Sequence, residues 1–199
     1  MLLTGLKRAT NDKTKVAEWW EWWPDANIAI ATGRASGFFV VDVDNYKAGA
    51  QEAFDGLVIE CGDELNDNSI IQLTGGGGVH RVFRYPDGSN IGSRADWREG
   101  IDIRGDGGYI VAAPSNHKSG NCYEWEGDEL LARDELTPAP EKLLALLVED
   151  HSKHLDSPRL ETGTIQATEE NIAELKSALE FIEADGSRDL WISVGMALS

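Results

Sequence analysis

Two aspartates separated by a single residue are the first place where this sequence could do chemistry. Asp42 and Asp44 stand at the end of the run FFVVDVD, residues 38–44. In a strand, alternate side chains point to the same face, so both carboxylates would project together while Val43 points into the core. Adjacent carboxylates repel unless a cation lies between them, and Mg²⁺ binds through one or two carboxylates plus substrate phosphates. The pair indicates a metal site, with two solvated acids at a strand end as the alternative.

A third aspartate interrupts a second apolar segment. Asp102 lies between Ile101 and Ile103, and Arg104 would share its strand face. A carboxylate buried alone is costly unless it is paired or bound to a metal. Two interpretations therefore stay open for Asp102. It is either the partner of Arg104 in an ion pair or the third acidic ligand that a two-metal nucleotidyl-transfer site would require.

A run of four glycines at 75–78 precedes His80. Glycine lets a backbone approach phosphate closely, and a histidine can donate to a phosphate oxygen. The run is not a P-loop, because no Lys-Ser/Thr pair follows at the required spacing. A flexible hairpin with a surface histidine is the alternative. Farther along, His117 and Lys118 could reach a triphosphate, although a polar turn is the simpler account.

The elements that must hold these side chains follow from apolar periodicity and turn residues. Helices are expected at 12–23, 48–61 and 141–150, and strands at 27–31, 38–43, 69–73, 80–85, 101–103 and 109–112. The segments 101–103 and 109–112 are expected to form a hairpin about Asp106-Gly107-Gly108. Trp20 and Trp23 are expected in the core, with base stacking as the alternative. A polar linker is expected at 151–168, followed by two helices at 169–183 and 188–198.

Composition limits the classes of function. The net charge is −17, yet residues 81–118 hold six basic and five acidic side chains, a net of +1. A tight, sequence-independent duplex binder needs a larger basic excess, because phosphate neutralisation drives that affinity. Charge therefore argues against strong DNA binding by this piece, but not against a metal–nucleotide site. No apolar run of about 18 residues indicates a membrane span, and the two cysteines fit a reducing cytoplasm.

Three segments in order resemble the bifunctional primase-polymerase domain of the archaeo-eukaryotic primase superfamily. They are ANIAIATGRASGFFVVDVDN, IIQLTGGGGVHRVFRY and GIDIRGDGGYIVAAPSNHKSGNCYEWEG, within a similarity that runs from about Gly5 to Leu147. The resemblance implies an α+β fold, in which helices flank an RNA-recognition-like β-sheet, and a catalytic domain at 1–150. It also implies that two divalent ions, Mg²⁺ or Mn²⁺, bind the family's three aspartates, here Asp42, Asp44 and Asp102.

The same resemblance implies how the incoming nucleotide is held. The family's small-residue-x-His motif contacts the nucleotide's phosphates, which points to His80 with Gly78, where several relatives have serine. The segment after the third aspartate resembles the family's nucleotide-binding segment and suggests Arg104, Ser115 and Lys118 as further contacts. The resemblance also implies template and primer DNA and an NTP or dNTP as partners.

The C-terminal stretch 177–199 looks like the opening of the helical primase C-terminal module found in phage and mobile-element proteins. Such proteins often continue into a ring-forming helicase, so we expect this chain to be a piece of a longer protein whose other parts grip DNA. The expected activity is DNA primase or polymerase in the replication of a phage, plasmid or other mobile element. The alternatives are a catalytically inactive replication-initiator or DNA-binding module of the same fold, and a metal-dependent phosphodiesterase.

Overall fold

A computed structural model describes residues 5–67, 70–127 and 136–155, and the structural statements below refer to these residues. A short 3₁₀ helix at Gly5–Arg8 precedes the α-helices, which are α1 (Lys13–Trp22), α2 (Ala50–Cys61), α3 (Glu64–Asp67) and α4 (Glu141–Leu155). The strands are β1 (Ile28–Ala31), β2 (Phe38–Val43), β3 (Ile70–Leu73), β4 (Val79–Arg84), β5 (Arg94–Arg98), β6 (Ile101–Arg104), β7 (Tyr109–Ala112) and β8 (Glu124–Trp125). This mixture confirms the predicted α+β class.

Strand β2 lies inside an antiparallel sheet of six strands, in the order β5-β6-β2-β4-β3-β8. Five of its six residues are buried, as expected for an apolar strand with structure on both faces. Its neighbours are β6 and β4, both antiparallel. Because β2 carries Asp42, the sheet order places the segments around residues 80 and 102 on either side of that carboxylate.

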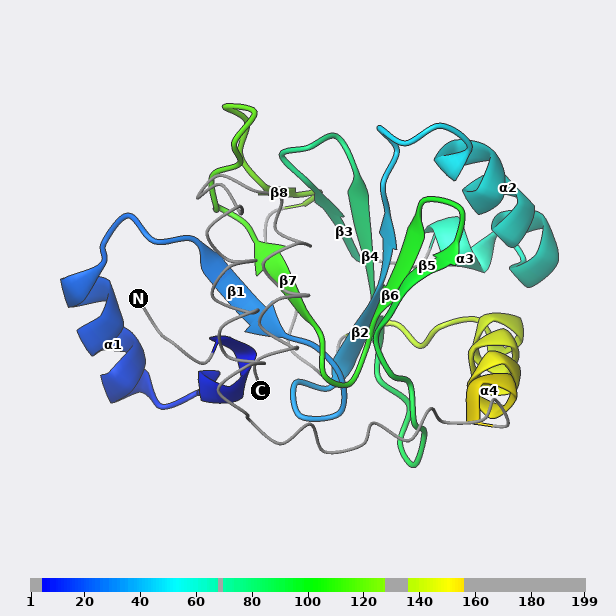
Figure 1. Ribbon diagram of the computed structural model, residues 1–199, viewed down its shortest axis with the longest axis horizontal. Coiled ribbons are helices and arrows are strands. Elements are labelled where there is room, and N and C mark those ends of the chain that lie inside the picture. Colours follow the sequence, from blue (N-terminus) through cyan, green and yellow to red (C-terminus); the bar gives the residue numbers. More distant parts are fainter. Residues whose placement is uncertain (1–4, 68–69, 128–135, 156–199) are drawn as a thin grey trace, which may run out of the picture. The chain divides into compact units, whose positions relative to one another are not determined.

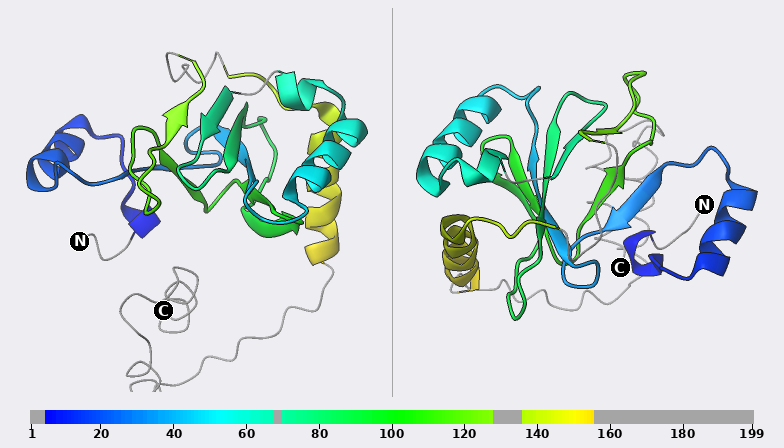
Figure 2. Two further views of the ribbon diagram at one scale, coloured as in Figure 1. Left: turned by 90° about the horizontal axis from the view of Figure 1, so that it is seen from above. Right: turned by 180° about the vertical axis from the view of Figure 1, so that it is seen from behind.

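The two faces of the sheet have different coverings. Phe39, Val41 and Val43 point to a core that includes Leu57 of α2 and Leu143 of α4. On the opposite face, the smaller cluster contains Val40 and Val82 of the large sheet and Ile110 of β7. Figures 1 and 2 show α2 and α4 on one side of the sheet and the β1–β7 pair on the other. Even-numbered residues of β2, Asp42 among them, therefore face the β1–β7 side.

The predicted hairpin of 101–103 with 109–112 is wrong. Strand β6 pairs with β2 and β5, whereas β7 pairs with β1 in a separate two-stranded sheet. The connection turns away at Asp106, whose carboxylate accepts hydrogen bonds from the Arg34 N–H and the Tyr85 hydroxyl, each 2.7 Å long. These bonds tie the turn to distant segments, so the chain leaves one sheet for the other instead of folding back.

The prediction that Trp20 and Trp23 are core residues is also wrong. Each is 38% exposed, and no residue of α1 is buried. The spacing that predicted one apolar face does produce a helix, whose N-cap is Asp12 through a 2.9 Å hydrogen bond to the Thr14 N–H. Helical spacing alone does not tell what covers that face.

The C-terminal predictions are tested only in part. Helix α4 ends at Leu155, five residues beyond the predicted end at Asp150. The remaining linker, 156–168, and the predicted helices 169–183 and 188–198 lie outside the described residues. Among the residues that the structure describes, no helix has the length and apolar character needed to cross a membrane.

Candidate active site

Four polar side chains form a row across neighbouring strands of the six-stranded sheet. Asp42 of β2 is the direct partner of Asp102 on β6 and of His80 on β4. His80 is in turn opposite Gln72 on β3. Directly opposed residues of antiparallel strands share a face and lie within about 5.5 Å at Cβ. Two segments 60 residues apart in sequence thus bring two of the predicted acids side by side.

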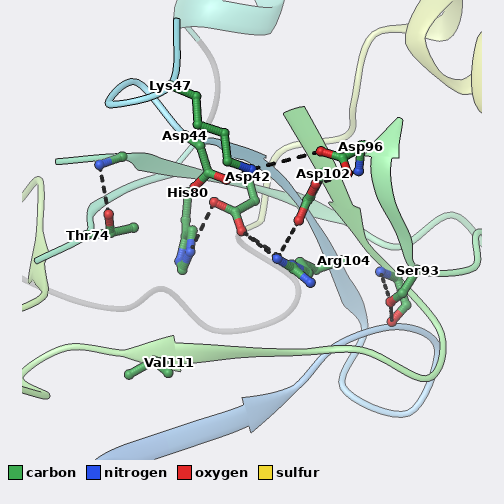
Figure 3. Close-up of polar contacts among 12 residues, drawn as sticks. Asp42, Asp44, Lys47, Thr74, His80, Ser93, Asp96, Asp102, Arg104 and Val111 are labelled. Carbon is green, nitrogen blue, oxygen red and sulfur yellow. Dashed lines mark hydrogen bonds and ion pairs between the residues drawn. The ribbon is translucent and has the colours of Figure 1, made fainter. Parts of the chain in front are cut away.

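The guanidinium of Arg104 joins these two acids (Figure 3). Its Nη2 lies 2.6 Å from Asp102 Oδ2 and 3.2 Å from Asp42 Oδ2. The two aspartates are only 6% and 7% exposed. The structure shows the ion pair of Asp102 with Arg104 and places Asp102 beside Asp42, whereas its role as a metal ligand stays a prediction.

The third acid has a cationic partner of its own. Asp44 directly follows β2, and its Oδ2 lies 2.8 Å from Lys47 Nζ. The same ammonium lies 3.9 Å from Asp96 Oδ1. Asp96 sits in an irregular stretch of β5 with a positive φ of 48°, and its backbone N–H donates a 2.7 Å hydrogen bond to Asp102 Oδ1. Bulges of this kind re-aim backbone groups near functional sites.

Burial shifts the pKa values of both Asp42 and His80 in the direction that favours their neutral forms. The pKa of Asp42 is raised to about 6, mainly by desolvation, while Arg104 acts to lower it and the neighbouring acids to raise it. Desolvation likewise lowers the pKa of His80 to about 4, so its imidazole is neutral at pH 7. His80 Nε2 lies 3.4 Å from Asp42 Oδ1. A buried acid with a raised pKa is a site where added positive charge would be strongly stabilised.

Comparison with known families shows to which family this chain belongs. The family model for the N-terminal domain of bifunctional DNA primase/polymerase matches residues 1–142. The chain belongs to this family. Membership implies nucleotidyl transfer of the DNA primase/polymerase type in general, and the match spans all three predicted aspartates and His80. No curated protein matches the chain.

In this primase/polymerase domain the glycine run forms a tight turn between β3 and β4. Gly78 donates its N–H to Thr74 Oγ1 at 2.8 Å, and its carbonyl accepts the Thr74 N–H. A Cβ built on Gly78 would lie 2.8 Å from the carbonyl oxygen of Val43. Close packing against the end of β2 therefore explains the glycine. The backbone N–H of Gly78 is already committed within the turn.

Two of the predicted nucleotide contacts, Ser115 and Lys118, are not bonded to the acids in the part of the chain that the structure describes. Ser115 is 3% exposed, and its hydroxyl accepts a 2.8 Å hydrogen bond from the Ile28 N–H of β1. Lys118 is exposed in the loop after β7. Within the described ranges, neither side chain has a hydrogen bond or ion pair to the three aspartates. In the structure His80 and Arg104 contact Asp42, whereas Ser115 and Lys118 have no such contact with the acids among the described residues.

Sequence reasoning missed two residues that contact this cluster. Lys47 follows Asp44 by three positions, a spacing that could have suggested an ion pair. Gln72 is fully buried and hydrogen-bonded to His80. A signal for Gln72 was present, because Gln72 and His80 are each four residues from Gly76, the middle of the glycine turn. A hairpin centred there places them opposite one another.

The donor set of the cluster fits a hard divalent cation such as Mg²⁺ or Mn²⁺. Its ligating atoms are carboxylate oxygens, which these ions prefer. Arg104 and Lys47 already place positive groups against the acids. In the described part of the chain, no three His, Cys, Asp or Glu side chains converge on one point. Binding of ions there would require these two basic side chains to give up part of their contacts.

Proposed function

We propose that this domain catalyses template-directed nucleotidyl transfer, as a DNA primase, a DNA polymerase or both. In this proposal Asp42, Asp44 and Asp102 hold two divalent ions, Mg²⁺ or Mn²⁺. The supporting observation is the direct pairing of Asp42 with Asp102, together with Asp44 at the end of the same strand. This pairing supports a common site for acids that are remote in sequence.

The chain's own residues have distinct roles in this proposal. Two bound ions would lower the pKa of the attacking hydroxyl and offset charge on the pyrophosphate that leaves. His80, neutral at pH 7, would donate a hydrogen bond to a phosphate oxygen of the incoming NTP or dNTP. Arg104 would turn part of its guanidinium from the acids to the triphosphate, since guanidinium groups bind phosphate in the same way as carboxylate. Lys118 and the turn at Gly78 are proposed as outer contacts of the nucleotide.

The proposal extends to the biological setting. The resemblance of 177–199 to the start of a helical primase module suggests replication of a phage, plasmid or other mobile element, with a ring helicase in the same protein. The near-neutral charge of 81–118 suggests that other parts of that protein supply most of the grip on template DNA. In this arrangement the catalytic domain occupies 1–150 and works in the cytoplasm.

A gel assay with end-labelled primer on a template strand tests the activity. The full 199-residue chain is incubated with Mg²⁺ or Mn²⁺, with and without dNTPs or NTPs, on primed and unprimed templates. We expect extension that needs both nucleotide and metal. Asp42→Asn and Asp102→Asn should abolish it, whereas Asp63→Asn, which removes an exposed acid before α3, should extend normally.

The same assay distinguishes the two alternative functions. Shortening of the labelled strand without nucleotides would indicate a metal-dependent phosphodiesterase. Template binding without incorporation under any of these conditions would indicate an inactive DNA-binding module. Normal extension by the Asp42→Asn variant would refute the proposed site.

A further inference from the structure

Gln72 is a fully buried polar residue whose side chain contacts three groups on two other segments, β4 and the end of β7. It lies on β3, opposite His80, and its relative exposure is 0%. Its amide contacts the ring of His80, the Val111 carbonyl and the Ala113 N–H. A buried side-chain amide satisfied on all sides has a defined orientation and can impose one on its neighbours.

The orientation of this amide follows from its backbone partners. The Ala113 N–H can only donate, and it lies 2.9 Å from Oε1. The Val111 carbonyl can only accept, and it lies 2.8 Å from Nε2. Rotating the amide by 180° would set oxygen against oxygen and N–H against N–H. The amide nitrogen of Gln72 is therefore the atom that faces His80.

The orientation of the amide determines the protonation pattern of the imidazole. Gln72 Nε2 lies 2.8 Å from His80 Nδ1 and carries only hydrogens to offer. Nδ1 must then accept and carries no hydrogen, so the ring holds a single proton, on Nε2. That nitrogen lies 3.4 Å from Asp42 Oδ1, on the side of the acids. Second partners of this kind commonly fix the tautomer of a functional histidine.

We propose that Gln72 is a positioning residue that holds His80 in the Nε2–H tautomer, with its N–H directed to the acid cluster. The tautomer itself is independent of any activity, but its use for binding a nucleotide phosphate rests on the proposed function. In the other tautomer, an Nε2 lone pair would face phosphate oxygens and the Asp42 carboxylate, and the contact would be repulsive. Because Gln72 also bonds residues 111 and 113, it couples the end of β7 to the orientation of His80.

The direct test is two-bond ¹H–¹⁵N correlation NMR of the histidine rings in the ¹⁵N-labelled 199-residue chain at pH 7.5. The His80 signals are assigned by their loss in His80→Gln. We expect the Nε2–H pattern in the wild type. In Gln72→Glu, one carboxylate oxygen can still accept the Ala113 N–H, but the other presents an acceptor to Nδ1, so the proton should move to Nδ1. An Nδ1–H wild type, or an unchanged pattern in Gln72→Glu, would overturn the proposal.

A second variant covers the case in which Gln72→Glu does not fold. Gln72→Met keeps the length of the side chain and removes both hydrogen-bonding groups, so His80 should populate both tautomers. Persistence of Nε2–H alone in this variant would show that Gln72 does not set the tautomer. Gln51→Met, at an exposed position of α2, is the matched control and should leave the His80 signals unchanged.

The kinetic test separates this role from a general effect on the fold. In primer extension, Gln72→Glu should raise the KM for the nucleotide about 10-fold, the cost of about 1.4 kcal/mol in binding, with the circular dichroism spectrum unchanged. If the proton of His80 moves to Nδ1 in Gln72→Glu while the KM for the nucleotide stays unchanged, the proposed link between the tautomer and nucleotide binding is overturned. If the wild type shows no extension at all, the proposed function fails, while the NMR result still decides whether Gln72 fixes His80.

Discussion

Asp42 and Asp102 stand directly opposite each other on β2 and β6, and one guanidinium, that of Arg104, spans both carboxylates. The pairing places two negative charges where the sheet is nearly closed to water. Such an arrangement is stable only with positive charge in contact. In the structure that charge comes from the protein itself, and in the proposed reaction it would come partly from metal ions.

Replacing Arg104 should separate metal binding from nucleotide binding. Arg104→Met removes a positive charge that competes with the ions at Asp42 and Asp102, so Mn²⁺ should bind more tightly in the absence of nucleotide. The same change removes a phosphate contact, and the KM for the nucleotide should rise roughly 10-fold. Calorimetric titration with Mn²⁺ and steady-state extension measure the two effects.

Arg98→Met is the matched control for this experiment. Arg98 lies on the adjacent strand β5, but it pairs with Glu60, away from the acid cluster. It should change neither the Mn²⁺ affinity nor the KM. Weaker Mn²⁺ binding by Arg104→Met would mean that the guanidinium organises the acids more than it competes with cations.

The buried carboxyl of Asp42 should make the free energy of unfolding depend on pH. A comparison with the Asp42→Asn variant should reveal this dependence. The pKa of Asp42 is raised from its ordinary 3.8 to about 6, so the folded state holds this proton more tightly than the unfolded state. The contribution to stability is complete below pH 4 and is lost as the pH rises through 6. Without metal, Asp42→Asn should therefore be more stable than the wild type at pH 7.5, by up to about 3 kcal/mol.

His80 has the opposite dependence, because its pKa is lowered to about 4. Its contribution to stability is lost as the pH falls from about 6.5 towards 4. In the wild type the two slopes partly cancel, whereas in Asp42→Asn the free energy of unfolding should rise with pH across this range. Urea unfolding in EDTA at pH 4.5, 5.5 and 7.5 measures the free energy of unfolding of the wild type and of Asp42→Asn. Equal stability of the two proteins at pH 7.5 would contradict the burial-induced shift of Asp42.

Introducing serine at position 78 should destabilise this protein. A Cβ there would lie 2.8 Å from the carbonyl oxygen of Val43. This oxygen is a backbone atom at the end of β2, so it cannot move aside as a flexible side chain could. Overpacking of this kind costs roughly 1–3 kcal/mol, so Gly78→Ser should lower the melting temperature and should not improve extension. Gly56→Ala is a control with open space around its Cβ inside α2 and should stabilise by about 0.5–1 kcal/mol. A stable and more active Gly78→Ser would show that the turn can open for a phosphate contact.

The parts of the fold that were predictable depended on local signals. The apolar run ending at Asp42 predicted β2, and strands were predicted on both sides of the glycine run, where β3 and β4 lie. The hairpin was the alternative for the glycine run, but its histidine is buried and not at the surface. Strand β5 was missed because RADWR carries two arginines and an aspartate and pairs through a bulge. The partners of β6 and β7 could not be read from periodicity, because the bonds of Asp106 to Arg34 and Tyr85 join residues 72 and 21 positions apart.

In the candidate site, too, local signals were predictable from the sequence and contacts between distant segments were not. The three acids and His80 were found as residue types in order, and the sheet register brings Asp42, Asp102 and His80 into one row. Two further partners of these side chains were not found as functional residues. Lys47 and Gln72 act through side-chain contacts that depend on the path of the chain after β2 and on the packing of β7. Contacts of this kind become visible only with the tertiary structure.

The central claim is that three aspartates form one metal site for an incoming nucleotide, and counting bound ions tests it most directly. Electron paramagnetic resonance measures free Mn²⁺ during titration of the 199-residue chain in the presence of a non-hydrolysable dNTP. We predict two Mn²⁺ per wild-type chain, and loss of at least one in both Asp42→Asn and Asp102→Asn, with Asp63→Asn unchanged. Wild-type stoichiometry and affinity in the Asp102→Asn variant would contradict the account.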